Sequence, residues 1–148
     1  MKTTIFALAL IASAFSLSAK EKTKFNYVMT KSDTVICEKL RFGFINAVCI
    51  LPNGEKTKVP NQEIVKYYQR GRLFEKMPLI ADNKPTGNMK FMELIRYSNG
   101  MRMYKYTTYN AKIGAPEIKL FIYKDDQYVL KVDENNKQCI NDFFALKK

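Results

Sequence analysis

The chain of 148 residues contains no histidine. This absence excludes Ser-His-Asp and Cys-His catalysis, metal sites that depend on imidazole, and the commonest general base near neutral pH. An enzyme built from this sequence would have to use carboxylates, lysine, tyrosine or a thiol. Tryptophan is absent as well, which weakens the case for a site that stacks sugar rings.

Glycine is scarce and the apolar runs are short. Only six glycines occur, and they are not clustered, so glycine-rich phosphate loops and nucleotide fingerprints are excluded. The longest apolar segment, residues 5–17, has about 13 residues, too few for a helix that crosses a bilayer core of about 30 Å. We therefore expect no transmembrane segment in the mature chain.

The N-terminal residues have the order of a secretory signal peptide. A positively charged start precedes the apolar segment 5–17, and small residues then lead to Ala19 before a charged stretch. This order predicts a signal peptide over residues 1–19, cleaved after Ala19, with Ser16 and Ser18 as alternative cleavage positions. We expect a periplasmic or secreted protein.

The mature chain, residues 20–148, has the length and charge of one basic domain. Removing the single lysine of the leader leaves 24 Lys and Arg against 14 Asp and Glu, a net charge of +10. Such a charge suits an anionic glycan, a lipid headgroup or an envelope protein as partner. The charges are scattered without a long run of one sign, and we expect no nucleic acid partner.

Turn-forming dipeptides divide the chain into short strands. Asn53-Gly54 and Asn99-Gly100 are typical of two-residue type I′ turns, and Arg70-Gly71 and Asp125-Asp126 are weaker versions of the same device. We predict a mainly β fold: an antiparallel meander forming a curled sheet or partly open barrel, with one C-terminal helix. A mixed α+β fold is the alternative.

Two of these turns imply specific strand registers. A loop at residues 70–71 places Lys66 opposite Glu75, and a loop at residues 125–126 places Ile122 opposite Val129. Opposite charges and paired apolar residues are the cross-strand neighbours that sheets favour. The agreement supports a β-meander.

Two further segments complete the predicted single domain. Residues 78–88 contain two prolines and a glycine and predict a loop between two halves of the meander. Near the C-terminus a helical face is expected, with Asp133, Asn135 or Asn136 as its cap. The residues of that face are Cys139, Ile140, Phe143, Phe144 and Leu146.

Three cysteines follow the leader. A hairpin about Gly43 would place Cys37 opposite Cys49, which makes this pair a candidate disulfide in an oxidising compartment. The alternative is that all three cysteines are small buried apolar residues, an interpretation that suits Cys139 best. Catalysis by a thiol is disfavoured, because no histidine is present to lower the pKa of a cysteine.

A basic-aromatic hairpin is the candidate ligand-binding site. Its tyrosines could stack on rings while its cations hold anionic groups. The alternative is that the tyrosines are half-buried strand residues that cover the sheet. The residues assigned to this site are Arg96, Tyr97, Arg102, Tyr104, Lys105 and Tyr106.

The acidic residues do not form a recognisable site. Asp125-Asp126 and Asp133-Glu134 could offer oxygen ligands to Ca²⁺, but the Asp-x-Asp-x-Asp-Gly pattern is missing. We expect no metal, no cofactor and no assigned catalytic residue. Paired carboxylates remain available for a hydrolase, and Glu38, Glu63, Glu93 and Glu117 are the candidates.

Residues 33–40, 52–60 and 83–87 together resemble small exported proteins of unknown function from Gram-negative bacteria of the gut-commensal type. The resemblance covers strand-and-turn segments and contains no catalytic signature. It implies a bacterial envelope setting and a β-rich single domain, and it implies no activity.

The predicted function is a non-catalytic binding or interaction module of the cell envelope. Two alternatives from other classes stay open. One is a cofactor-free, carboxylate-based hydrolase, and the other is a structural or assembly factor that acts through an exposed edge strand.

Overall fold

The computed structural model describes residues 25–145. The expected signal peptide, its cleavage at Ala19, and Leu146 of the expected helix face lie outside this range. Within it the chain is mainly β with one C-terminal helix, so the predicted fold class is confirmed. No helix of the described part is both long and apolar enough to cross a membrane.

Eleven strands and one helix cover residues 25–145. The strands of the first half are β1 (Asn26–Thr30), β2 (Thr34–Cys37), β3 (Lys39–Phe42), β4 (Asn46–Ile50), β5 (Lys56–Pro60) and β6 (Ile64–Gln69). The second half contains β7 (Arg72–Ala81), β8 (Lys84–Ser98), β9 (Met101–Asn110), β10 (Ala115–Lys124), β11 (Gln127–Lys131) and the helix α2 (Lys137–Ala145).

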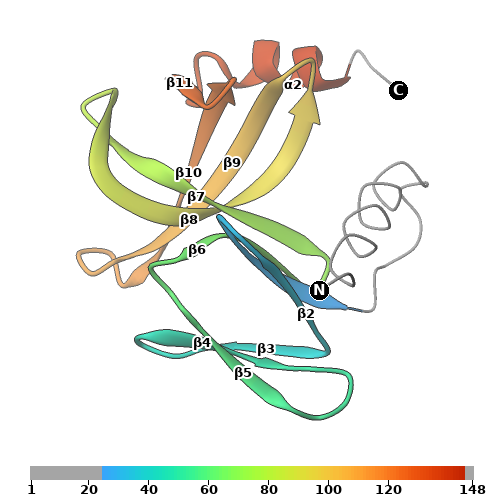
Figure 1. The fold of residues 1–148 in the computed structure, drawn as a ribbon. Coiled ribbons are helices and arrows are strands. Elements are labelled where there is room, and N and C mark those ends of the chain that lie inside the picture. Colours follow the sequence, from blue (N-terminus) through green and yellow to red (C-terminus); the bar gives the residue numbers. More distant parts are fainter. Residues whose placement is uncertain (1–24, 146–148) are drawn as a thin grey trace.

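The strands form two antiparallel sheets (Figure 1). The large sheet has eight strands in the order β11-β10-β9-β8-β7-β6-β1-β2, and the small sheet has the order β3-β4-β5. The large sheet curls without closing into a barrel. Its long β7–β8 hairpin bends back toward β10, where the Tyr123 hydroxyl donates a hydrogen bond to the Pro78 carbonyl at 2.9 Å.

Three predicted two-residue turns are confirmed. Both residues of Arg70-Gly71, Asn99-Gly100 and Asp125-Asp126 have φ between 49° and 80°, as a type I′ turn requires. The first of these turns pairs Lys66 with Glu75, as expected. Past the third turn a bulge next to Tyr123 shifts the register, so that Ile122 faces Leu130 and not Val129.

The Asn53-Gly54 turn is longer than predicted. Pro52 has no N–H group and could not close a two-residue loop through a backbone donor. Instead the Gly54 N–H bonds to the Leu51 carbonyl at 2.9 Å, and the Leu51 N–H bonds to the Glu55 carbonyl at 2.8 Å. Gly54 alone takes the left-handed conformation, with φ of 84°, as in a three-residue loop with a bulge.

The predicted loop at residues 78–88 is wrong. Strands β7 and β8 continue through this segment and meet at an Asp82-Asn83 turn, where φ is 49° and 58°. Short polar side chains tolerate this conformation. Pro78 lies beyond the pairing of β7 with β6, and Pro85 lies before the pairing of β8 with β9, so neither proline deprives a third strand of a hydrogen bond.

Two hydrophobic cores lie on opposite faces of the large sheet. Adjacent residues of β8 divide between them, because Phe91 packs on the first core and Met92 belongs to the second. The first core, between the two sheets, contains Val28, Cys37, Leu40, Ala47, Cys49, Val59 and Ile64. The second contains Met77, Met92, Tyr104, Phe121 and Tyr123.

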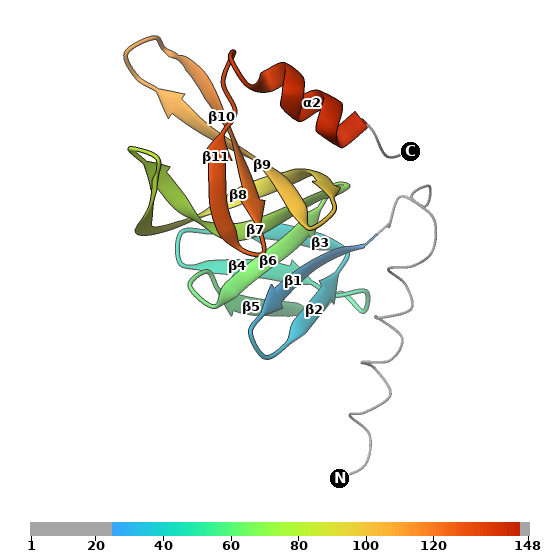
Figure 2. The ribbon, with the colours of Figure 1, turned by 90° about the horizontal axis from the view of Figure 1, so that it is seen from above.

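The helix α2 lies beside the C-terminal strands (Figure 2). Among the expected caps, Asp133 has the capping geometry, because its carboxylate accepts from the N–H groups of Asn135 at 2.9 Å and Asn136 at 3.1 Å, and its carbonyl accepts from the Lys137 N–H at 3.0 Å. The Asn136 side chain points back along the chain instead: its oxygen accepts from the Asp133 N–H and its amide donates to the Lys131 carbonyl, both at 2.9 Å. Cys139 is exposed, so its expected burial on the helix face is wrong.

Candidate binding surface

The predicted basic-aromatic site does not form one exposed face. Tyr104 is 0% exposed and belongs to the second core, and Tyr106 packs against that core. Since residues two apart on a strand share a face, Arg102 points to the same side. A stacking role for Tyr104 is therefore wrong, because the curled sheet covers the ring.

Arg102 and Tyr104 instead belong to an ion-pair network. The Tyr104 hydroxyl donates a hydrogen bond to Glu75, and Arg102 lies 3.5 Å from the same carboxylate and 2.9 Å from Asp126. Burial, and next the neighbouring Glu75, raise the pKa of Tyr104 above its usual range. The pKa of Arg102 is also raised: burial lowers it, but the contacts with Tyr104, Asp126 and Glu75 outweigh that effect.

The remaining members of the predicted site are dispersed. The Arg96 guanidinium donates to the Asn141 side chain of α2 at 3.2 Å, and Lys105 pairs with Glu93 at 2.7 Å. Tyr97 lies opposite Arg102 across the β8–β9 turn and is 67% exposed. Tyr97 is thus the aromatic ring of the set that is open to solvent, and its cationic neighbours already have partners.

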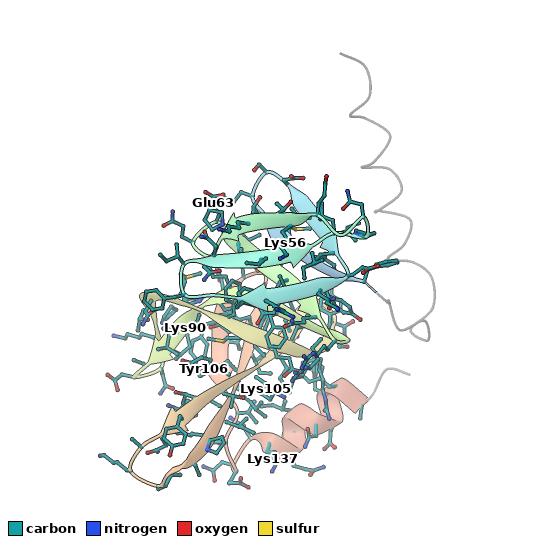
Figure 3. The ribbon with its side chains drawn as sticks, turned by 90° about the horizontal axis from the view of Figure 1, so that it is seen from below. Lys56, Glu63, Lys90, Lys105, Tyr106 and Lys137 are labelled. Carbon is teal, nitrogen blue, oxygen red and sulfur yellow. The ribbon has the colours of Figure 1, made fainter. Side chains whose placement is uncertain are left out.

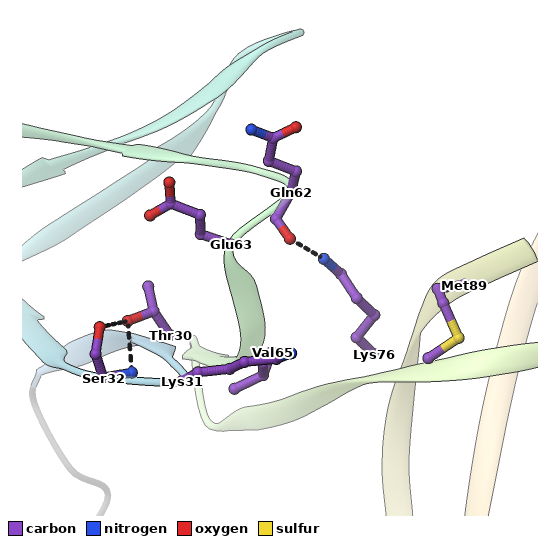
Figure 4. A pocket seen from close by; sticks show the side chains of 8 residues that line it. All are labelled: Thr30, Lys31, Ser32, Gln62, Glu63, Val65, Lys76 and Met89. Carbon is purple, nitrogen blue, oxygen red and sulfur yellow. Dashed lines mark hydrogen bonds between the residues drawn. The ribbon is translucent and has the colours of Figure 1, made fainter.

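A groove of about 680 Å³ opens where β6 begins and β7 runs on (Figure 4). Lys76 reaches across it and donates hydrogen bonds to the carbonyls of Gln62 at 2.9 Å and Asn61 at 3.2 Å. Burial, and next the nearby Lys31, lower the pKa of Lys76. The Lys76 ammonium thus serves to fix the β5–β6 connection to β7.

A second groove of about 450 Å³ adjoins the first, sharing Lys76 as a lining residue, and contains two carboxylates, Glu75 and Asp126. Both are bound by Arg102. A hydrolase needs one carboxyl group free to exchange a proton and another free to attack or to activate water. The ion pairs occupy both groups, so this arrangement is typical of a structural network.

Cys37 and Cys49 are buried in the same core but are not partners on paired strands. The expected register is wrong, because the chain passes from the large to the small sheet at Glu38 and Cys49 pairs with Leu40. Both cysteines are free thiols in this structure. Burial, and next the neighbouring Cys49, raise the pKa of Cys37 to about 12.

The outer face of the small sheet gathers four cations. On β3 and β5 the residues that alternate with the buried Leu40 and Val59 point away from the first core. The strand register orders them in two rows, each with an aliphatic residue between two cations. We call this the cationic face: the rows are Arg41-Val48-Lys58 and Lys39-Ile50-Lys56.

Among residues 25–145 no carboxylate forms an ion pair with the cationic face. The strands β3, β4 and β5 contain no acidic residue. All four cations are exposed, and within residues 25–145 none of them forms an ion pair. Figure 3 views the molecule from the side of the small sheet, with Lys56 labelled on it.

Sequence reasoning missed the cationic face although a signal was present. Lys39 and Arg41 are two residues apart, as are Lys56 and Lys58, so each pair must share one face of a strand. What could not be read was that β3 and β5 flank the same strand. The four cations come together through the pairing of β4 with both neighbours.

Comparisons with known proteins find no relative. No protein-family model matches the chain, and no curated protein or solved structure is similar to it. Within residues 25–145 the structure brings together no group of three or more acidic or cysteine side chains that could hold a metal ion.

Proposed function

We propose that this chain is an exported, non-catalytic binding module of the bacterial cell envelope that holds an anionic ligand on its cationic face. The observation that carries the proposal is the set of four exposed cations on strands without any acidic residue. Elsewhere Arg102 and Lys105 are paired with carboxylates. The cationic face is thus a concentrated positive surface on a protein of net charge +11.

The geometry favours an extended ligand over a small one. The cations stand in two rows separated by two residues, about 7 Å along the strands. Each Lys or Arg close to an anionic surface contributes about 1 kcal/mol, and salt screens that contribution. Four such contacts add up for a ligand that carries repeated negative charges, such as an anionic glycan or a layer of lipid headgroups.

The two alternative functions have less support. For a hydrolase, the paired carboxylates Glu75 and Asp126 are bound by Arg102. For an assembly factor, the edge strands of the large sheet are short, with four residues in β2 and five in β11. Short edges offer few free backbone groups to a partner strand.

The test compares two variants that lose the same charge. The Arg41→Gln/Lys58→Gln variant removes one row of cations, and the Lys124→Gln/Lys131→Gln control removes two exposed cations from β10 and β11. On a column of sulfated polysaccharide the first variant should elute at clearly lower salt than the control. Equal elution of the two variants would mean that net charge and not the cationic face governs binding.

Export is tested separately. We expect the protein purified from the envelope of its host to have lost residues 1–19, which intact mass measurement detects directly. Recovery of the full 148-residue chain from the cytosol would contradict this part of the proposal.

A further inference from the structure

The β3–β4 turn exposes two large apolar side chains. Phe44 is fully exposed and Ile45 is 68% exposed. We call these two residues the apolar tip. A single exposed apolar side chain is common, but two adjacent ones at the end of a hairpin form a point that water solvates poorly.

The backbone of the apolar tip is held in place by Asn61. The Asn61 side-chain amide donates to the carbonyls of Gly43 at 2.9 Å and Phe44 at 3.1 Å, and its backbone N–H donates to the Ile45 carbonyl at 2.9 Å. A larger residue in place of Gly43 would be tightly packed, because its Cβ atom would lie 3.0 Å from the Asn46 carbonyl oxygen. The apolar tip is thus presented by a fixed backbone.

The same hydrogen bonds satisfy the carbonyl groups at the tip. A backbone group that enters hydrocarbon without a partner costs several kcal/mol. Because Asn61 occupies all three carbonyls, the turn can leave water without losing these bonds.

The apolar tip adjoins the cationic face. Arg41 lies in β3 three residues before Phe44, and Lys58 stands across β4 in the same row, the row closer to the turn. Figure 1 places the β3–β4 turn at one end of the small sheet, projecting from the body of the molecule. An apolar point bordered by cations is typical of proteins that bind the surface of anionic membranes.

We propose that the ligand of the cationic face is an anionic phospholipid bilayer, with Phe44 and Ile45 inserted below the headgroups. This inference rests on the proposed function. Arg41 and Lys58 contact lipid phosphates while the apolar tip enters the boundary of the acyl chains. An anionic glycan would engage the cations equally well but would leave the apolar tip in water, so the exposed pair favours the bilayer.

The first experiment measures sedimentation with vesicles of phosphatidylcholine, with and without phosphatidylglycerol. The wild-type chain should bind only the vesicles that contain phosphatidylglycerol. Arg41→Gln/Lys58→Gln should weaken binding about 30-fold, from about 1 kcal/mol per cation. Phe44→Ser should weaken binding about tenfold or more. The control Tyr97→Ser also removes an exposed aromatic ring, 67% exposed and near another turn, and should change binding less than twofold.

A second experiment uses the absence of tryptophan from the chain. The variant Phe44→Trp carries a single indole at the apolar tip. On adding phosphatidylglycerol vesicles its emission should shift to shorter wavelength and be quenched by brominated acyl chains. The control Tyr97→Trp should show neither change, and circular dichroism checks that both variants fold.

The outcomes separate the two proposals. If the protein binds the sulfated polysaccharide through Arg41 and Lys58 but the Phe44→Trp emission stays unchanged with vesicles, bilayer insertion is wrong and the proposed function stands. Binding to vesicles that is insensitive to Phe44→Ser also overturns insertion. If neither polysaccharide nor anionic vesicles are bound, both proposals fall.

Discussion

The two ends of the large sheet differ in what they do with charge. At the C-terminal end, cations of β7, β9 and β10 are paired with carboxylates, as in Arg72–Glu93, Lys105–Glu93, Arg102–Asp126 and Lys119–Glu117. At the N-terminal end, the small sheet that packs on β1 and β2 presents four cations without an ion-pair partner among residues 25–145. The difference teaches that ion pairs hold several cations in place at one end, whereas at the other end all four cations of one sheet face stay open to solvent.

The two cores also differ in whether they bury polar side-chain groups. The first is aliphatic with two thiols, and nothing in it needs a hydrogen-bond partner beyond the backbone. The second is built on tyrosines and methionines, and the hydroxyls of Tyr104 and Tyr123 are satisfied by Glu75 and the Pro78 carbonyl. Polar groups are thus buried at the C-terminal end, where they tie the long β7–β8 hairpin to β9 and β10.

The largest expected effect comes from breaking the second core. Tyr104→Ala removes a fully buried ring and should lower the free energy of unfolding by about 3–5 kcal/mol, measured by urea denaturation. Tyr97→Ala should change it by no more than about 0.5 kcal/mol, because Tyr97 is largely exposed. Similar losses in the two variants would show that the hairpin does not bury Tyr104 as described.

A smaller effect distinguishes the paired cations from the free ones. Arg102→Met removes the partner of Glu75 and Asp126 and should lower the free energy of unfolding by about 1–2 kcal/mol. Arg41→Met removes a cation without such a partner and should change it by less than about 0.5 kcal/mol. Equal values from urea denaturation would remove the contrast between the two ends of the molecule.

The smallest effect concerns the thiols of the first core and is seen at alkaline pH in the presence of a reductant. Burial raises the pKa of Cys37 to about 12, so the folded state keeps a proton that the unfolded state loses above pH 9. The contribution of the Cys37 thiol to the free energy of unfolding is fully present below pH 9 and is lost as the pH rises toward 12. The free energy of unfolding should fall by about 1 kcal/mol between pH 9 and 10.

The control for this pH dependence is Cys37→Ala. The variant should be less stable at neutral pH but should lose less stability between pH 9 and 10. Part of the dependence will remain, because burial also raises the pKa of Tyr123 to about 12. An unchanged pH slope in the variant would contradict the assignment to Cys37.

Prediction from the sequence worked where the physics is local. Arg70-Gly71 and Asp125-Asp126 adopt positive φ without help from the rest of the fold, and the register next to each turn follows. The predicted register became wrong a few residues from the Asp125-Asp126 turn, where a bulge beside Tyr123 shifts the pairing of β10 with β11. The loop expected at residues 78–88 was also wrong for a non-local reason. Proline is tolerated in a two-stranded ribbon, and the sequence does not show that no third strand pairs with this segment.

The candidate site shows the same limit. Alternation along β9 correctly placed Arg102 and Tyr104 on one face, but no local signal says which face of a strand becomes buried. That choice depends on how the β7–β8 hairpin curls over β10. The disulfide expected between Cys37 and Cys49 remains a prediction, and their position in one core arises from packing between two sheets and not from a hairpin.

By itself the sequence determined the mainly β class, three tight turns and the capped C-terminal helix, because these depend on residues that are near one another in the chain. Only the tertiary structure decided that Tyr104 is core, that four cations from two strands share one open face, and that Phe44 projects beside them. Burial and charge neutralisation depend on what a second, distant segment brings to a residue, and that information is not local.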